Sequence, residues 1–229
     1  MITAIVLAAG KGSRMKSDIQ KQFMLLGEYP VVYYSLKVFE ESRVDNIILV
    51  TGKQDIEYCR HNIVEKYGFS KVSHIVAGGK ERYESVKNAL KAADESDYIM
   101  IHDGARPFIT DKMIEDSMEA VKRFNACTVG MPVKDTIKMV DDKQFGVETP
   151  DRKYVYQIQT PQTFNKGLLS DCYSKMENDK NIAVTDDTMV VELYSGTKSK
   201  VLAGSYKNIK ITTPEDIKIA EIFLQNMLT

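Results

Sequence analysis

Tryptophan is absent from the 229-residue sequence and cysteine is scarce, with Cys59, Cys127 and Cys172 as its three representatives. These cysteines are odd in number, far apart in the chain and without a C-x-x-C pair. A disulfide framework or a structural zinc site needs cysteines that are paired or closely spaced, so the sequence argues against both. We expect three free thiols in the core, where free cysteine is most often found.

The sequence also lacks an excess of charge of one sign and any long apolar run. Its 31 Lys and Arg residues balance 32 Asp and Glu residues, so no overall electrostatic field would attract nucleic acid or a membrane surface. No apolar run approaches the roughly 18 residues of a membrane-spanning helix, and the N-terminus shows no secretory signal. These absences predict a cytoplasmic protein without nucleic acid or membrane partners.

Short apolar runs alternate with stretches of helical periodicity through residues 1–132. The apolar runs predict strands at 5–9, 46–50, 72–77, 98–102 and 126–132. The helical stretches predict helices at 31–41, 54–67, 80–93 and, after an N-cap at Thr110, up to Phe124. This alternation is typical of crossover units, so we expect an α/β fold, a Rossmann-like and mostly parallel sheet with helices on both faces.

The pattern changes at residues 133–156. A strand is predicted at 133–140 and a turn at 141–143, and the remainder is polar without a helical period. We expect a β-arm that projects from one domain spanning residues 1–229. Further predicted elements are helices at 166–176 and 185–194, a strand around 208–211, and a last helix that begins at Thr213-Pro214.

The first predicted strand ends in a loop suited to a polyphosphate. Gly10 and Gly12 allow the backbone N–H groups to approach an anion closely. The loop adds four basic residues, Lys11, Arg14, Lys16 and Lys21. The Walker pattern is absent, so a triphosphate loop that carries its own cations is the interpretation we adopt.

A second group of polar residues, His102-Asp103-Gly104-Ala105-Arg106, follows the strand at 98–102. Ligands of open α/β sheets bind outside the carboxyl ends of strands, so Asp103 could meet a sugar hydroxyl or a Mg²⁺ ion on phosphates. Alternatively, Asp103 and Arg106 form a structural ion pair. His102 is interpreted as a packed strand residue, because no second histidine lies at a metal-binding spacing.

No nucleophile and base pair can be found in the sequence. The G-x-S-x-G motif is absent and no cysteine lies in a reactive context. An attacking substrate phosphate would need no protein base, because its second pKa of about 6 leaves it largely dianionic at neutral pH. Lysines, arginines and one Mg²⁺ would then be sufficient for in-line phosphoryl chemistry.

Seven motifs follow one another along nearly the whole chain. They are AAGKGSRM with KQF (8–15 and 21–23), GGKERYES (78–85), HDGARPF (102–108), PVKDTIK (132–138), QTPQTF (159–164), TDD (185–187) and NIKITTPED (208–216). In this order they resemble the 2-C-methyl-D-erythritol 4-phosphate cytidylyltransferase family of the non-mevalonate isoprenoid pathway. The resemblance implies that CTP reacts with a polyol phosphate to give a CDP-alcohol and pyrophosphate, with Mg²⁺ as cofactor.

The resemblance also implies roles for individual residues. The implied catalytic residues are Arg14, Lys21, Arg152 and Lys210. The implied nucleotide-binding residues are Ala8, Ala9, Gly10, Lys11, Gly12, Gly79, Ser85 and Asp103, with Asp103 also facing the metal. The implied acceptor-binding residues are Thr136, Arg152, Thr160 and Thr185. Members of the family are homodimers that exchange their arms, so Thr136 and Arg152 would act in the partner's site.

Three alternatives remain open at this point. The nearest is a ribitol 5-phosphate cytidylyltransferase, whose members are similar in fold and loop. A nicotinamide-dependent oxidoreductase is disfavoured because Met15 stands where the G-x-G-x-x-G fingerprint needs its third glycine. A non-catalytic nucleotide-binding module is disfavoured because Arg14, Lys21 and Lys210 are all retained.

Overall fold

A seven-stranded sheet forms the centre of the computed structural model, which describes residues 1–10, 15, 20–177, 179 and 183–228. The strand order is β11-β7-β10-β6-β1-β4-β5. The strands are β1 (Ile2–Ala8), β4 (Asn46–Thr51), β5 (Val72–Ala77), β6 (Tyr98–Asp103), β7 (Ala126–Pro132), β10 (Tyr156–Asn165) and β11 (Lys200–Ala203). β10 runs antiparallel to both of its neighbours, and every other pair is parallel.

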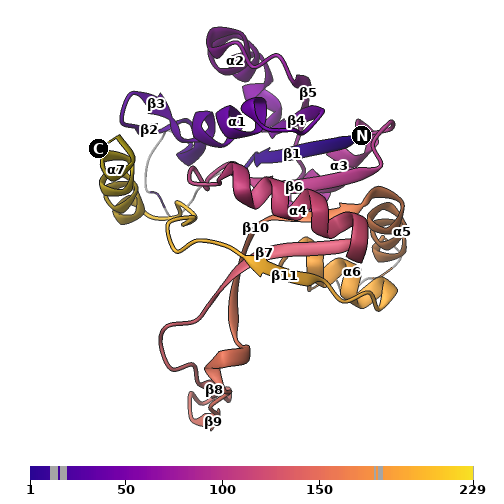
Figure 1. Cartoon of the computed structure of the whole chain (residues 1–229), viewed down its shortest axis with the longest axis vertical. Helices are drawn as coiled ribbons and strands as arrows, with labels where there is room; N and C mark the ends of the chain where they lie inside the picture. The colour runs from indigo at the N-terminus through magenta and orange to yellow at the C-terminus, as the bar shows by residue number, and fades with distance from the viewer. Residues whose placement is uncertain (11–14, 16–19, 178, 180–182, 229) are drawn as a thin grey trace.

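Helices cover both faces of this sheet (Figure 1). They are α1 (Val31–Glu41), α2 (Ile56–Cys59), α3 (Arg82–Lys91), α4 (Asp111–Phe124), α5 (Lys166–Met176), α6 (Asp187–Ser195) and α7 (Pro214–Leu228). The mostly parallel α/β fold predicted from the sequence is therefore confirmed. None of the helices within the described residues is both long and apolar enough to cross a membrane.

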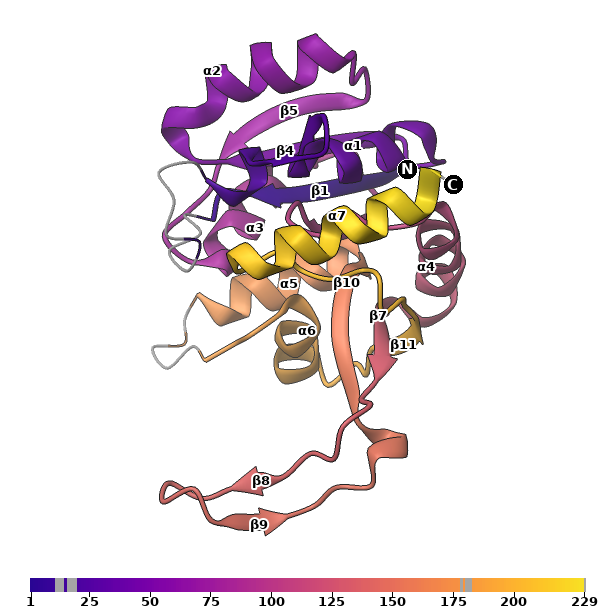
Figure 2. The ribbon, with the colours of Figure 1, turned by 90° about the vertical axis from the view of Figure 1, so that its left-hand side faces the viewer.

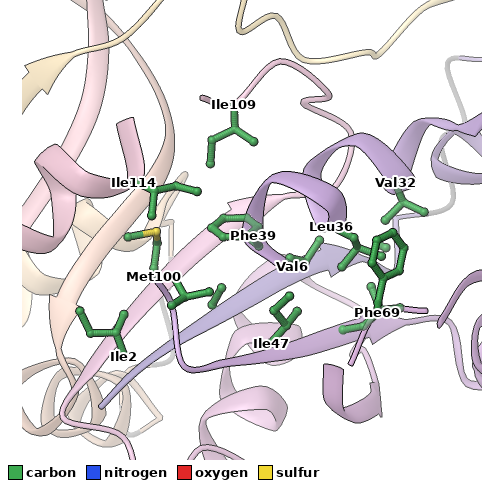
Figure 3. Close-up of a cluster of buried hydrophobic side chains, with 14 of the residues drawn as sticks. Ile2, Val6, Val32, Leu36, Phe39, Ile47, Phe69, Met100, Ile109 and Ile114 are labelled. Carbon is green, nitrogen blue, oxygen red and sulfur yellow. The ribbon is translucent and has the colours of Figure 1, made fainter. Parts of the chain in front are cut away.

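The core divides into two layers because successive side chains of a strand point to opposite faces. On one face, Val6 and Met100 pack with Phe39 of α1 and Ile114 of α4, as Figure 3 shows. On the other face, Ile5 and its neighbours pack with residues of α3, α5 and α6. Cys59 and Cys172 are buried in these two layers and Cys127 in a smaller cluster with Val121, and all three thiols are free, as expected. Burial raises the pKa of the Cys59 thiol to about 11.

Several predicted elements lie at the expected residues. α1 and α5 have the predicted bounds, and the Thr110 hydroxyl accepts a hydrogen bond from the Met113 amide at the start of α4 (3.3 Å). The helix expected at 54–67 is instead divided into the 3-10 helix η3 (Lys53–Asp55), α2 and the π-helix η4 (Arg60–Glu65). Two further 3-10 helices are η2 (Lys21–Phe23) and η5 (Arg152–Tyr154).

The prediction of a strand around 208–211 is wrong. This segment is not part of any sheet, and the Ile211 amide instead donates to the Ala105 carbonyl (2.9 Å). Its alternation of polar and apolar residues reflects docking against the end of β6 rather than a place in the sheet. The sequence interpretation also missed β11 and β10, and β2 (Leu25–Leu26) and β3 (Tyr29–Pro30) form a further small hairpin.

Residues 133–156 form an arm that projects from the sheet, as Figures 1 and 2 show. The strand expected at 133–140 is reduced to β8 (Met139–Val140), which pairs with β9 (Gly146–Glu148). Large apolar side chains on this arm are exposed, and Phe145 and Tyr154 are exposed by 70% and 78%. A two-stranded hairpin has too few contacts to bury such side chains by itself.

Candidate active site

A cavity of about 860 Å³ opens at the carboxyl ends of four neighbouring parallel strands, β1, β4, β5 and β6. This is the edge at which open α/β sheets bind ligands, and the volume suits a nucleotide-sized molecule. The lining residues are Leu7, Ala9, Gly10, Gln20, Lys21, Gln22, Gly52, Lys53, Gln54, Gly78, Gly79, Lys80, Glu81, Arg82, Glu84, Ser85, Asp103, Ala105 and Lys210.

Asp103, the last residue of β6, lies in this cavity among three cations. Its carboxylate is 2.8 Å from Lys210 Nζ, 3.6 Å from Arg106 Nε and 3.7 Å from Arg82 Nε. Burial alone would raise the pKa of Asp103, but these cations outweigh it and hold the pKa well below its usual range. The carboxyl group is therefore ionised at any working pH.

The turn after β6 holds Lys210 beside Asp103. The Arg106 amide donates to the Asp103 carbonyl (2.9 Å), and this bond closes the turn. The Arg106 guanidinium donates to the Asn208 carbonyl (2.8 Å), and Ile211 is bonded to Ala105 as described above. These contacts at Asn208 and Ile211 lie on either side of Lys210. They fix its segment against a turn that is about a hundred residues earlier in the sequence.

Behind the turn lies a buried group formed by His102, Thr160 and Asn208. Thr160 Oγ1 is 3.0 Å from the Asp103 amide and 3.0 Å from His102 Nδ1. Asn208 Nδ2 donates to the Thr160 carbonyl (2.9 Å). Burial lowers the pKa of His102 to about 4, so its imidazole is neutral at neutral pH.

Arg82, near the start of α3, connects Asp103 with the start of α6. Its Nη2 is 2.7 Å from Asp187 Oδ2, and the Tyr173 hydroxyl donates to Asp187 Oδ1 (2.6 Å). Burial and the nearby Asp187 raise the pKa of Tyr173 well above its usual value, so this hydroxyl stays protonated. Gln162 completes the group, because its side-chain oxygen Oε1 accepts from the Asp187 backbone amide (3.0 Å).

A smaller cavity of about 300 Å³ adjoins this group. Thr185 and Asp186 lie in its wall, and Glu81 and Arg82 line both cavities. The two spaces are therefore neighbours that share Arg82.

The turn between β5 and α3 approaches β1 closely. A Cβ atom on Gly78 would lie 2.4 Å from Ala9 Cβ and 2.8 Å from Ser85 Oγ. The Gly79 amide donates to Ser85 Oγ (3.0 Å), which shapes the wall of the cavity. Glycine is required at position 78 because any side chain there would collide with the end of β1.

The structure brings many of the predicted site residues together. Those that line the large cavity are Ala9, Gly10, Lys21, Gly79, Ser85, Asp103 and Lys210. Thr185 lines the smaller cavity, Thr160 lies behind Asp103, and Ala8 ends β1 without appearing in either lining. Thr136 and Arg152 lie on the arm, away from both cavities of their own chain. The predictions for Lys11, Gly12 and Arg14 lie outside the described residues.

Sequence reasoning missed Gln22, which is almost fully buried. Its side-chain Nε2 donates to the Ala8 backbone carbonyl (2.5 Å) and to Gln20 Oε1 (2.6 Å), so Gln22 anchors the segment that carries Lys21 to the end of β1. Its position within the KQF motif was the signal that could have drawn attention to it. Tyr173 and Gln162 were also missed, because their contacts depend on distant parts of the chain.

Comparison with known proteins gives one consistent result. The family profile described as 2-C-methyl-D-erythritol 4-phosphate cytidylyltransferase matches residues 2–226. A protein of that name from Lachnospira eligens is 51% identical over 227 residues, which cover 98% of this chain and 100% of the relative. One from Clostridium novyi (strain NT) is 49% identical over 227 residues, with 99% and 97% covered.

Solved structures are also similar. The crystal structure of 4-diphosphocytidyl-2C-methyl-D-erythritol synthase from Anaerococcus prevotii matches with a TM-score of 0.87 and 37% identity, over 98% of this chain and 96% of that one. The 2-C-methyl-D-erythritol 4-phosphate cytidylyltransferase from Thermus thermophilus has a TM-score of 0.77 at 24% identity, over 96% and 98% of the two chains, and supports the fold alone.

Proposed function

Because the chain belongs to the 2-C-methyl-D-erythritol 4-phosphate cytidylyltransferase family, we propose that it transfers CMP from CTP to 2-C-methyl-D-erythritol 4-phosphate and releases pyrophosphate. The observation that carries this proposal is the cavity at the strand ends, in which Asp103 is surrounded by Lys210, Arg106 and Arg82. An ionised carboxylate with several cations at a nucleotide-sized cavity suits phosphoryl transfer.

The reaction needs charge stabilisation and alignment rather than a protein base. An oxygen of the acceptor phosphate attacks the α-phosphorus of CTP, and the bond from that phosphorus to the bridging oxygen of the β-phosphate breaks. Pyrophosphate leaves with the electron pair of that bond. Lys21 and Lys210 line the cavity and would stabilise the charge that develops on the phosphate oxygens. We assign Arg14 the same role from its motif position.

The nucleotide would lie along the ends of β1 and β5. Gly10, Gly79 and Ser85 face the cavity there and, with Ala8 and Ala9, would hold the cytidine. Lys11 and Gly12 are assigned to the triphosphate from their motif alone. The acceptor would lie near Thr185 and on the side of Asp103 behind which Thr160 is buried, next to Arg82, which lines both cavities.

Magnesium is the cofactor we propose. Mg²⁺ is often held by one or two carboxylates together with substrate phosphates and water, and Asp103 supplies an ionised carboxylate at the cavity. Among the described residues no cluster of three His, Cys, Asp or Glu side chains could hold a metal, so the remaining ligands would come from CTP and water. When bound, the ion would neutralise charge on the triphosphate.

The arm would act in a second copy of the chain. Thr136 and Arg152 are exposed, and the Arg152 guanidinium contacts only the nearby Lys134 carbonyl (3.3 Å) among the side-chain hydrogen bonds of the described residues. The exposed Phe145 and Tyr154 give the arm an apolar surface that a partner subunit could cover. We therefore propose a homodimer in which each arm brings Thr136 and Arg152 to the partner's acceptor.

The compartment we propose is the cytoplasm. All three cysteines are free and buried, which is consistent with a reducing environment.

Turnover with CTP and two acceptors tests the activity. We expect formation of a CDP-alcohol with 2-C-methyl-D-erythritol 4-phosphate, with pyrophosphate as the second product. If only ribitol 5-phosphate were turned over, the proposed acceptor would be wrong and ribitol 5-phosphate would take its place. Binding of NAD without binding of CTP, measured by calorimetric titration, would overturn the transferase assignment.

A further inference from the structure

The antiparallel pairing of β6 with β10 ends before the turn that carries Asp103. Ile101 pairs with Gln162, and no residue of β10 is paired with His102 or Asp103. The pairing of β10 with β7 also shifts register between Ile158 and Gln162. The Thr160 hydroxyl takes the place of the missing backbone partner, because the Asp103 amide donates to Thr160 Oγ1 (3.0 Å). β6 pairs with β1 up to Asp103, which lies opposite Leu7, so the Thr160 hydroxyl fixes Asp103 on the side of β6 where the pairing with β10 has ended.

The orientation of that hydroxyl depends in turn on His102. The Arg106 carbonyl can only accept, so His102 Nε2, 3.1 Å away, carries the proton and donates to it. In a neutral imidazole Nδ1 is then an acceptor, and the Thr160 hydroxyl donates to it (3.0 Å). The hydrogen bonds therefore run in one direction, from the Asp103 amide through Thr160 and His102 to the Arg106 carbonyl.

This chain of hydrogen bonds connects both ends of the turn after β6. The Arg106 guanidinium donates to the Asn208 backbone carbonyl (2.8 Å), and Asn208 Nδ2 donates to the Thr160 backbone carbonyl (2.9 Å). Lys210 follows two residues later and contacts Asp103. A change at His102 would therefore alter the spacing between Asp103 and Lys210 without removing either group.

We propose that His102, acting through Thr160, is a positioning residue for cytidylyl transfer. It holds Asp103 and Lys210 at the spacing that the reacting phosphates require. His102 is fully buried, and neither His102 nor Thr160 is among the described residues that line the two cavities, so the effect is indirect. The proposal rests on the proposed function, because it concerns the rate of that reaction.

Steady-state kinetics of matched variants tests the proposal. His102→Phe keeps a flat ring against Phe39, which lies 5.5 Å away between ring centroids, but removes both nitrogen atoms. We expect kcat to fall roughly 10- to 100-fold, as for a small misplacement of reacting groups, while KM for CTP changes less. His102→Gln should recover part of kcat, because its amide offers both an acceptor and a donor.

Val121→Ala is the control, because Val121 is equally buried but lies in α4 with a different set of neighbours. It should lower thermal stability and leave kcat unchanged. If His102→Phe fails to fold, Thr160→Val and Thr160→Ser take its place. The serine variant keeps the hydroxyl and should retain more of kcat than the valine variant.

A double-mutant cycle with Asp103→Asn separates positioning from general damage. If His102 acts through Asp103, His102→Phe should lower kcat much less in the Asp103→Asn background than in the wild type. Equal fold-losses in both backgrounds, or wild-type kcat in a folded His102→Phe variant, would overturn the proposal. Absence of cytidylyl transfer in the wild type would instead refute the proposed function.

Discussion

Asp103 is the residue at which four parts of the chain meet. It ends β6, its carboxylate contacts Arg82 of α3 and Lys210 of the segment before α7, and its backbone amide donates to the Thr160 hydroxyl of β10. Each of these contacts joins residues that are far apart in the sequence. The low pKa of Asp103 follows from this convergence of cations, which keeps its carboxylate ionised at the cavity.

Lys21 provides a test at the same scale. It lines the cavity in η2, next to the buried Gln22. Because its ammonium would meet charge that develops in the transition state, Lys21→Ala should lower kcat by roughly 10²–10³ with little change in the dissociation constant of CTP. Steady-state kinetics and calorimetric titration measure the two quantities.

Lys218→Ala is a suitable control, because Lys218 is an exposed lysine of α7 that lines neither cavity. It should behave as the wild type does. A loss of CTP affinity as large as the loss of kcat in Lys21→Ala would make Lys21 a ground-state contact only.

Among the elements, the carboxyl ends of β1, β4, β5 and β6 build the cavity. The strands come close enough there that Gly78 has no space for a side chain. The hydrogen bond from the Gly79 amide to Ser85 then continues the wall into α3. The turn between β5 and α3 therefore determines the shape of this side of the cavity, where we propose that the nucleotide binds.

Gly78→Ala tests this close approach. The added methyl group must displace Ala9 or the turn itself, which should cost roughly 1–3 kcal/mol in the free energy of unfolding. We also expect weaker binding of CTP, because Ala9 and Gly79 line the cavity. Chemical unfolding and calorimetric titration provide the measurements.

The matched variant is Gly146→Ala on the arm, where a Cβ atom would lie 3.7 Å from Lys138 Cδ, an ordinary contact. Its stability and CTP affinity should equal those of the wild type. If Gly78→Ala also matched the wild type in stability and CTP affinity, the turn would accommodate a side chain and the proposed close approach would be wrong.

The elements also show how far sequence reasoning extends. α1 and α5 were predicted at their observed bounds, because helical periodicity is a local signal. The segment at 208–211 has the alternation of a strand, but its contacts are with Ala105 and Arg106, which no local pattern reveals. The contact of Thr160 with His102 spans 58 residues and depends on where β10 leaves β6.

At the scale of the whole molecule, the arm contributes none of the described residues that line the two cavities of its own chain. It projects from the sheet (Figure 2). Large apolar side chains on it, such as Phe145 and Tyr154, are exposed. Thr136 and Arg152 lie on it, whereas Lys21 and Lys210 line the cavity. If the site is shared, a complete set of these residues exists only in the dimer.

Mixed dimers test this sharing. A Lys21→Ala subunit paired with an Arg152→Ala subunit should contain one site with both lesions and one intact site, because the intact arm serves the subunit that retains Lys21. Turnover should therefore return in the mixture although each parent variant is impaired. Mixed dimers proven by differential tags that remain inactive would count against arm exchange.

The central claim is that the site around Asp103 and Lys210 performs cytidylyl transfer. The most direct test compares pyrophosphate release from CTP by the wild type and by Lys210→Ala, with 2-C-methyl-D-erythritol 4-phosphate as the acceptor and the CDP-alcohol quantified by mass spectrometry. We predict one CDP-alcohol for each pyrophosphate in the wild type and a loss of roughly 10²–10³ in kcat in the variant. Undiminished turnover by a folded Lys210→Ala enzyme, or none by the wild type, would contradict this account.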